Sequence, residues 1–296
     1  MNEMTFPEQP AILFAEECDR GIQNEENQGA VLHLRIAMGE LLIVADGIGG
    51  GAEGALASRL VAEHFYVHMA ALPYDYPADK AIREAAALAN EKILAAAKAP
   101  DSPKAKMGST VVVALVRLRN GEISASIGNI GNSRAYLLRS ERLYRLTIDH
   151  SGAQSMLDRS LISPEDAQHH PAASIATRSL GNQPKVEIDI EQHPLAIGDT
   201  LLLCSYGVWG ALPEKEIEAA AAGTALGAAA HELREKALAA DGRNNIAIEM
   251  ARLMVPLPPV APRKGELPIA FKWVMIIFLL AIAGFCALIY TVFLRH

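Results

Sequence analysis

The chain has 296 residues, a formal net charge of −7 and a pI near 5.7, so it has room for one sizeable domain or two small ones. This acidic balance, with no run of basic and aromatic residues, argues against nucleic-acid binding. Cys18, Cys204 and Cys286 are widely spaced, which excludes a disulfide framework and a CxxC metal pair. We expect all three to be reduced thiols in buried or membrane-embedded positions.

Strand patterns dominate the first half of the chain. Two apolar runs on either side of Met38-Gly39 predict a hairpin, and a second hairpin is predicted around Asn120-Gly121, the strongest short turn signal. A third is predicted around Ser140-Glu141. Later apolar runs predict strands over 199–205 and 245–253.

Helical periodicity appears in three stretches, which are 52–70, 78–99 and 214–240. The strands come as antiparallel hairpins, and the helices stand between groups of strands rather than after each one. This order favours an α+β sandwich over an alternating parallel sheet.

The stretch 49–54, "GGGAEG", matches the GxGxxG pattern of dinucleotide sites, after a strand and before a helix. That kind of site also needs a second parallel strand ending in an acid about 20 residues on. Here a proline-broken loop and another helix follow, and Asp46 would repel a pyrophosphate. We therefore reject a dinucleotide site.

The end of the chain predicts a membrane anchor. Trp273–Leu294 runs 22 residues without a charge. As a helix it would measure about 33 Å, enough for a hydrocarbon core of roughly 30 Å. We place a transmembrane helix at 270–294, after a proline-rich juxtamembrane linker at 255–269 and a domain at 8–254.

Flanking charge predicts the orientation of this anchor. Arg263, Lys264 and Lys272 precede it, whereas Arg295 alone follows it, so we expect the domain on the cytoplasmic side of a single-pass membrane protein. The first ten residues lack the basic and apolar segments of a signal peptide, which agrees with this orientation.

Several short motifs resemble one family in their order and spacing. They are "VADGIGGGAEGALAS" from Val44, "MGSTVVVALV" from Met107, "GNSRAY" from Gly131, "ATRSLGNQP" from Ala176, "GDTLLLCSYG" from Gly198 and "RNNIAI" from Arg243. Together they resemble the metal-dependent serine/threonine phosphatases of the PPM, or protein phosphatase type 2C, family. The resemblance implies a four-layer αββα fold, a β-sandwich flanked by helices on both faces.

The family's chemistry uses two or more Mg²⁺ or Mn²⁺ ions held by carboxylates. Carried over position by position, Asp46 and the Gly47 carbonyl match family metal ligands. Neutral residues stand at the other metal positions, which are Gln28, Gly29, Asn132, Tyr206 and Asn244. Asn24 stands at the phosphate-binding arginine, and Arg20 lies too far along the chain to replace it.

A single remaining carboxylate predicts a degenerate, catalytically inactive member, a pseudophosphatase with no catalytic residue and no expected cofactor. It would act in signalling as a regulatory module that binds a protein, either a phosphoprotein or a membrane-bound kinase. Two alternatives stay open: an active phosphatase that uses Mn²⁺ or Mg²⁺ at an atypical site, and a purely structural membrane protein. Asp46 is interpreted either as a turn residue or as a vestigial ligand that holds one ion weakly.

Other polar residues receive structural interpretations. We expect His150 to bind local backbone, and Arg134 and Arg178 to be structural. The pair His169-His170 has no second ligand pair at zinc spacing. The helix face from Glu214 to Glu218 is interpreted as solvated surface.

Overall fold

The computed structural model describes residues 11–98 and 107–254. The predicted linker and anchor, 255–269 and 270–294, lie outside this part of the chain. Within 11–98 and 107–254, no helix combines the length and the apolar character needed to cross a bilayer.

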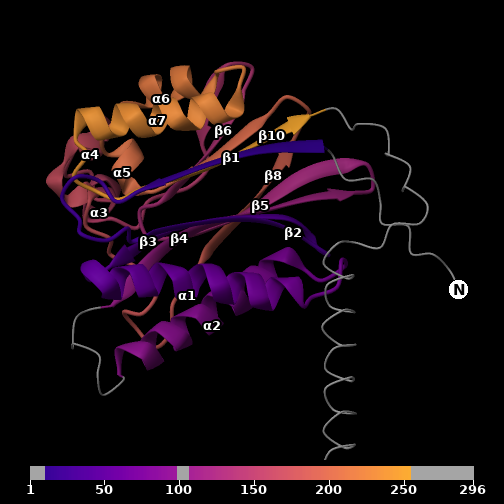
Figure 1. Ribbon diagram of the computed structural model, residues 1–296, viewed down its shortest axis with the longest axis horizontal. Helices are drawn as coiled ribbons and strands as arrows, with labels where there is room; N and C mark the ends of the chain where they lie inside the picture. The colour runs from indigo at the N-terminus through magenta and orange to yellow at the C-terminus, as the bar shows by residue number, and fades with distance from the viewer. Residues whose placement is uncertain (1–10, 99–106, 255–296) are drawn as a thin grey trace, which may run out of the picture. The chain divides into compact units, whose positions relative to one another are not determined.

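Two five-stranded sheets form the centre of the fold, and every neighbouring pair of strands is antiparallel (Figure 1). The β3 sheet has the order β2 (Gly29–Ile36), β3 (Gly39–Ile48), β4 (Gly108–Arg119), β5 (Glu122–Ile130) and β8 (Asp189–Leu195). The β10 sheet has the order β1 (Ala11–Asp19), β10 (Ile246–Met254), β9 (Thr200–Cys204), β6 (Arg134–Arg139) and β7 (Arg142–Arg145).

Helices cover the outer face of each sheet (Figure 1). The β3 sheet is covered by α1 (Gly51–Ala70) and α2 (Ala78–Ala97), and the β10 sheet by α5 (Tyr206–Trp209), α6 (Glu214–Ala221) and α7 (Leu226–Ala240). Between β7 and β8 the chain forms α3 (Gly152–Asp158), α4 (Pro164–His169) and a 3₁₀ turn (Pro171–Ala173). The predicted α+β sandwich is confirmed.

Alternation along β3 shows how the sequence builds these layers. Leu41, Ile43 and Ala45 pack with α1 and α2, whereas Leu42 and Val44 pack against the other sheet. Successive side chains of a strand point to opposite faces, so a continuous apolar run fits a strand buried on both sides. Because Asp46 is the next residue after Ala45, it falls on the inner, sheet-facing side of β3.

The three predicted hairpins are confirmed as β2–β3, β4–β5 and β6–β7. Positive φ angles at Asn120 and Gly121, and at Ser140 and Glu141, give these two turns the backbone twist that two-residue hairpins favour. In the sequence, β3 precedes α1 and α2, and β4 follows them. A dinucleotide-binding fold would need these two strands to be parallel, but they pair antiparallel, so the rejection of a dinucleotide site is confirmed as well.

Two predictions need correction. The helical stretch 214–240 is two helices, because the guanidinium of Arg252 binds the carbonyl oxygens of Gly223 and Thr224 between them. Cys18 is exposed, not buried, because it lies on the edge strand β1; Cys204 is buried, and both are free thiols.

Candidate functional site

Asp46 lies within β3, opposite Gly29 on β2 and Thr110 on β4. Its Oδ1 is buried and has no hydrogen-bond partner within the described part of the chain. Burial raises the pKa of Asp46 to about 7, and a hydrogen bond with the Asn245 side chain opposes that rise. The interpretation of Asp46 as a turn residue is therefore wrong, because a strand position does not offer its carboxylate a set of loop N–H groups.

The Asn245 side chain that binds this carboxylate belongs to a network of amide side chains. The buried Gln28 donates its backbone N–H to Asn245 Oδ1 at 3.2 Å and its Nε2 to Asn24 Oδ1 at 3.4 Å. Asn24 in turn donates its Nδ2 to the carbonyl oxygens of Arg20 and Arg243, at 2.8 and 3.3 Å. The side chain at the position of the family's phosphate-binding arginine is thus bound to the protein's own backbone.

Two glycines let α1 approach the end of β3. A Cβ on Gly47 would lie 2.1 Å from the carbonyl oxygen of Gly54, and a Cβ on Gly54 would lie 2.2 Å from Gln28 Oε1. No side chain fits at position 47 against the backbone of Gly54, and a side chain at position 54 would have to displace that of Gln28. Gly47 and Gly54 therefore serve close packing of strand, helix and Gln28, which is one reason for a glycine-rich loop here.

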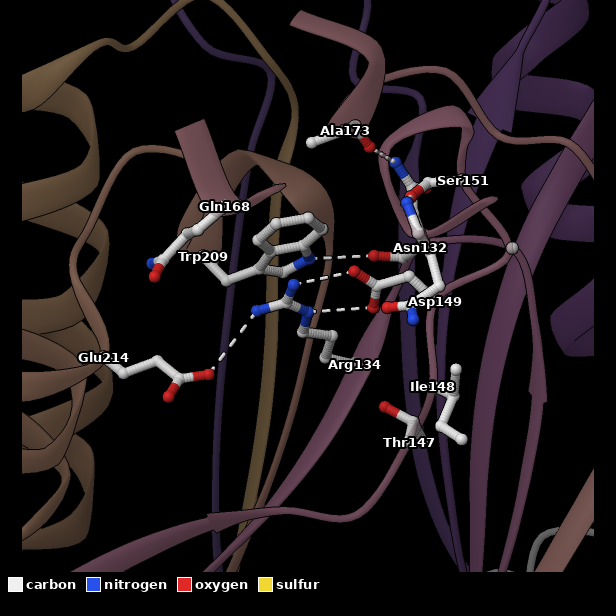
Figure 2. A network of polar contacts seen from close by, with 12 residues as sticks. Asn132, Arg134, Thr147, Ile148, Asp149, Ser151, Gln168, Ala173, Trp209 and Glu214 are labelled. Carbon is white, nitrogen blue, oxygen red and sulfur yellow. Dashed lines mark hydrogen bonds and ion pairs between the residues drawn. The ribbon is translucent and has the colours of Figure 1, made fainter. Parts of the chain in front are cut away.

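Asn132 contacts a second polar cluster (Figure 2). Its Nδ2 donates to the carbonyl oxygen of Ala173 at 2.9 Å, and its own carbonyl oxygen accepts the indole N–H of Trp209 at 2.8 Å. Asn132 therefore connects Ala173 of the 3₁₀ turn to Trp209 of α5. Its amide nitrogen is therefore committed to the protein's own backbone.

Arg134 forms the centre of this cluster (Figure 2). Its Nε and Nη2 donate to the two carboxylate oxygens of Asp149 at 2.9 and 2.7 Å, and its guanidinium carbon lies 3.3 Å from the Trp209 ring centroid. Nη1 donates to the Tyr136 hydroxyl and lies 3.6 Å from Glu214 Oε1. We call Arg134, Tyr136, Asp149, Trp209 and Glu214 the Arg134 cluster; it confirms a structural role for Arg134.

Tyr206 and Asn244 line one groove on the surface. Tyr206 begins α5, and its ring packs edge-on against Trp209 with centroids 4.9 Å apart. Burial raises the pKa of its phenol. Asn244 donates its Nδ2 to Asp241 Oδ2 at 3.3 Å.

The structure brings most of the predicted positions together through a chain of contacts. Gly29 pairs with Asp46, Gly47 donates its N–H to the Gln28 carbonyl, and Ser205, beside Tyr206, donates its hydroxyl to the Asn245 carbonyl. Asn132 connects to this group through Trp209 on α5. Among residues 11–98 and 107–254, no three His, Cys, Asp or Glu side chains gather closely enough to hold a metal ion.

The remaining polar predictions have mixed outcomes. The prediction for His150 is correct only in part: its Nδ1 accepts a backbone N–H at 3.0 Å, but from Gly131, 19 residues away, while its Nε2 lies 3.0 Å from Asp189. The prediction of a solvated helix face at Glu214–Glu218 is wrong in part, because Glu214 contacts Arg134 and Glu218 accepts the Leu143 N–H at 2.7 Å.

Three important residues were not predicted. Trp209 and Asn245 carry the contacts described above; no local pattern marks Trp209, whereas Asn245 lies within the motif "RNNIAI" without being singled out. Glu249 lies on β10, fully buried, with both carboxylate oxygens lacking a partner in the described part of the chain. The one available signal was a lone acid within the apolar run of this predicted strand.

Comparisons with known proteins agree with this architecture. The Protein phosphatase 2C family model matches residues 21–240. The serine/threonine phosphatase stp of Listeria monocytogenes is 36% identical over 182 residues, which are 60% of this chain and 70% of that protein. The serine/threonine protein phosphatase PstP of Mycobacterium tuberculosis is 31% identical over 242 residues, 81% of this chain but 45% of that longer protein.

Solved structures give the same result. The crystal structure of M. tuberculosis PstP superposes with a TM-score of 0.73 at 30% identity, covering 82% of this chain and 99% of that one. That of Stp1 from Staphylococcus aureus superposes with a TM-score of 0.76 at 26% identity, covering 86% and 99%. The chain belongs to the protein phosphatase 2C family of serine/threonine phosphatases.

Proposed function

We propose that this chain is a catalytically silent member of the family that binds phosphoproteins as a regulatory module. The observation that carries the proposal is the donor set around Asp46. Asp46 is the one carboxylate among the positions that match the family's metal ligands, and the others hold amides, a phenol and a glycine, where family members that hydrolyse phosphate esters hold their metal ions with several carboxylates.

Charge is the first difficulty for a metal pair. Two divalent cations carry four positive charges, and Asp46 supplies at most one negative charge. Burial raises the pKa of Asp46 to about 7 in the absence of a cation. At an effective dielectric near 20, each missing contact charge removes on the order of several kcal/mol.

The neutral residues do not replace that charge. Mg²⁺ and Mn²⁺ prefer anionic oxygen ligands, and an amide oxygen supplies no charge. The phenol of Tyr206 stays protonated at neutral pH, since burial raises its pKa. Asn24 lacks the bidentate fork with which arginine grips a phosphate. The residues present do not fit the family's metal pair.

An assay on the full chain in mild detergent tests this proposal. With millimolar Mn²⁺ or Mg²⁺ we expect no hydrolysis of an aryl phosphate or a phosphoserine peptide above background, but measurable binding of the same phosphopeptide. Metal-dependent turnover that is lost in Asp46→Ala would overturn the proposal.

The second candidate is an active phosphatase with a reduced metal site. Similarity to proteins named as serine/threonine phosphatases favours it, and Asp46 and Gly47 are both retained. In this case Mn²⁺ or Mg²⁺ would activate the water that attacks phosphorus. The same assay separates the two candidates.

We further propose that residues 270–294 anchor the domain to a membrane with the domain in the cytoplasm, near membrane-bound partners such as a kinase. The uncharged run and the basic residues before it support this placement. Carbonate washing of membranes should leave the protein bound. Release by carbonate, or digestion of the domain by protease added outside intact spheroplasts, would contradict the anchor or its orientation.

A further inference from the structure

A groove of about 640 Å³ opens beside two of the substituted metal positions, Tyr206 and Asn244. The residues His169 and His170, at the end of α4, line it from one segment of the chain. Arg243, in the loop between α7 and β10, lines it from another. The groove thus gathers three side chains that donate hydrogen bonds and carry or accept positive charge.

Hydrogen bonds within the protein leave donors of these side chains free. His170 Nδ1 accepts the backbone N–H of Ala172 at 3.1 Å, so in the neutral ring the proton resides on Nε2. Arg243 donates only its Nε to Asp241 in the described part of the chain, and its side chain is 63% exposed. Its two terminal nitrogens are therefore available to a ligand, as is the exposed ring of His169.

Asp241 is the one acid among the described residues that line the groove, and both of its oxygens are already bound. Oδ1 accepts from Arg243 Nε, and Oδ2 accepts from Asn244 Nδ2 at 3.3 Å. A carboxylate at position 206 or 244 would add negative charge to this groove. The neutral Tyr206 and Asn244 leave it suited to an anion.

We propose that this groove binds the phosphoryl group of a phosphorylated serine or threonine, through Arg243, His169 and His170 and without a metal ion. A phosphate monoester offers a charge near −2 and three acceptor oxygens, which matches these three donors. Protein-borne donors here take the place of metal ions in holding the ligand. This inference rests on the proposed phosphoprotein-binding function and assigns the residues that perform it.

The test uses the full chain in mild detergent with EDTA. Fluorescence anisotropy measures binding of a labelled phosphoserine peptide and of its unphosphorylated form, and the ³¹P linewidth measures binding of orthophosphate. The variant His169→Ala, His170→Ala, Arg243→Ala is compared with Arg142→Ala, which removes an exposed charge on β7, outside the groove. Arg243→Gln alone serves as a milder variant if the triple variant does not fold.

We expect the phosphopeptide and orthophosphate to bind the wild type, and the unphosphorylated peptide to bind much more weakly. The triple variant should weaken both phosphate ligands at least about tenfold, since a charge-assisted hydrogen bond is worth that much. Arg142→Ala should stay within about twofold of wild type, as expected for an exposed charge outside the site.

The outcomes separate the groove from the wider function. Binding of orthophosphate that the triple variant abolishes, without binding of the phosphopeptide, supports the groove and overturns the phosphoprotein-binding function. Phosphopeptide binding that the triple variant retains supports that function and overturns the groove. Failure of both ligands to bind the wild type overturns the groove outright.

Discussion

The Arg134 cluster and the surroundings of Asp46 belong to the same sandwich, but they differ in whether a buried charged group has a partner of opposite charge. In the Arg134 cluster a buried guanidinium meets a buried carboxylate through two hydrogen bonds and stacks on Trp209. At Asp46 one carboxylate oxygen is buried and has no partner in the part of the chain that the structure describes, while Gln28 binds Asn245 and Asn24.

This difference distinguishes the groups that stabilise the folded domain from the groups that metal binding would require. A buried ion pair with complete hydrogen bonding works within the protein alone. A group of carboxylates at the other site would repel one another unless cations bound between them. A domain that keeps the fold without the metal pair needs residues at these positions whose hydrogen bonds are satisfied by the protein alone.

The largest effect is expected from restoring acids at the five positions, as Gln28→Glu, Gly29→Asp, Asn132→Asp, Tyr206→Asp and Asn244→Asp. Without metal, like-charge repulsion and the lost ring of Tyr206 should lower the free energy of unfolding by more than about 5 kcal/mol. Added Mn²⁺ should then raise the melting temperature, since ligand that binds only the folded state stabilises it.

The milder double variant Asn132→Asp, Asn244→Asp is the control for complete unfolding of the fivefold variant. It should show the same two effects at smaller size in thermal melts with and without Mn²⁺. Unchanged melting in both variants, with no response to Mn²⁺, would show that these positions do not surround one site.

Breaking the Arg134 cluster should have the next largest effect. Arg134→Met leaves Asp149 buried without its partner, which typically costs about 3–5 kcal/mol. Urea unfolding measures this loss, and Arg142→Met on the surface of β7 is the matched control. Adding Asp149→Asn to Arg134→Met should recover part of the loss; a loss below about 1 kcal/mol for Arg134→Met would contradict the account of this cluster.

Glu249 extends the comparison, because it is a buried acid whose carboxylate has no hydrogen-bond partner among residues 11–98 and 107–254. Burial raises its pKa from 4.5 to about 9, with a smaller contribution from Glu16 on the neighbouring strand. The folded state therefore holds a proton that the unfolded state releases, and stability falls as pH rises from about 4.5 to about 9. At pH 7 this costs about 3 kcal/mol.

Glu249→Leu should remove that cost, raise the melting temperature at pH 7 and flatten the dependence of stability on pH in this range. The exposed Glu16→Gln is the control and should change the pH dependence only slightly. If Glu249→Leu melts no higher than wild type and keeps the same pH dependence, the carboxyl is not neutral in the folded protein.

The smallest effect is expected at the rim of the Arg134 cluster. Glu214 is 47% exposed and lies 3.6 Å from Arg134 Nη1. Glu214→Gln should lower the free energy of unfolding by less than about 1 kcal/mol, as for other solvent-exposed pairs. A loss as large as that of Arg134→Met in the same urea experiment would mean that Glu214, rather than Asp149, compensates the guanidinium.

The strands with strong local signals were predictable, and the weak edge strands were not. Asn120-Gly121 marks its hairpin through residues that tolerate positive φ. The edge strand β8 alternates between partly buried and exposed residues and contains Pro194, so it has no clear apolar run. The edge strand β1 begins with the apolar run AILFA but ends in polar residues, and it was not predicted either. The break after α6 depends on Arg252, which lies far along the chain.

The site was predictable only through the resemblance to a family. Motif order located Asp46, Asn132, Tyr206 and Asn244, but no spacing in the sequence brings these residues together. The partners that satisfy them, such as Asn245 and Trp209, come from long-range packing. Whether a buried acid such as Glu249 has a partner is likewise decided by tertiary structure.

Calorimetric titration of Mn²⁺ into the metal-free full chain in mild detergent tests the central claim most directly. If the site does not fit a metal pair, the titration should show at most one weak ion, with a Kd in the millimolar range or above, and the same result for Asp46→Ala. Two ions bound with micromolar Kd, and lost in Asp46→Ala, would contradict the claim and favour an active phosphatase.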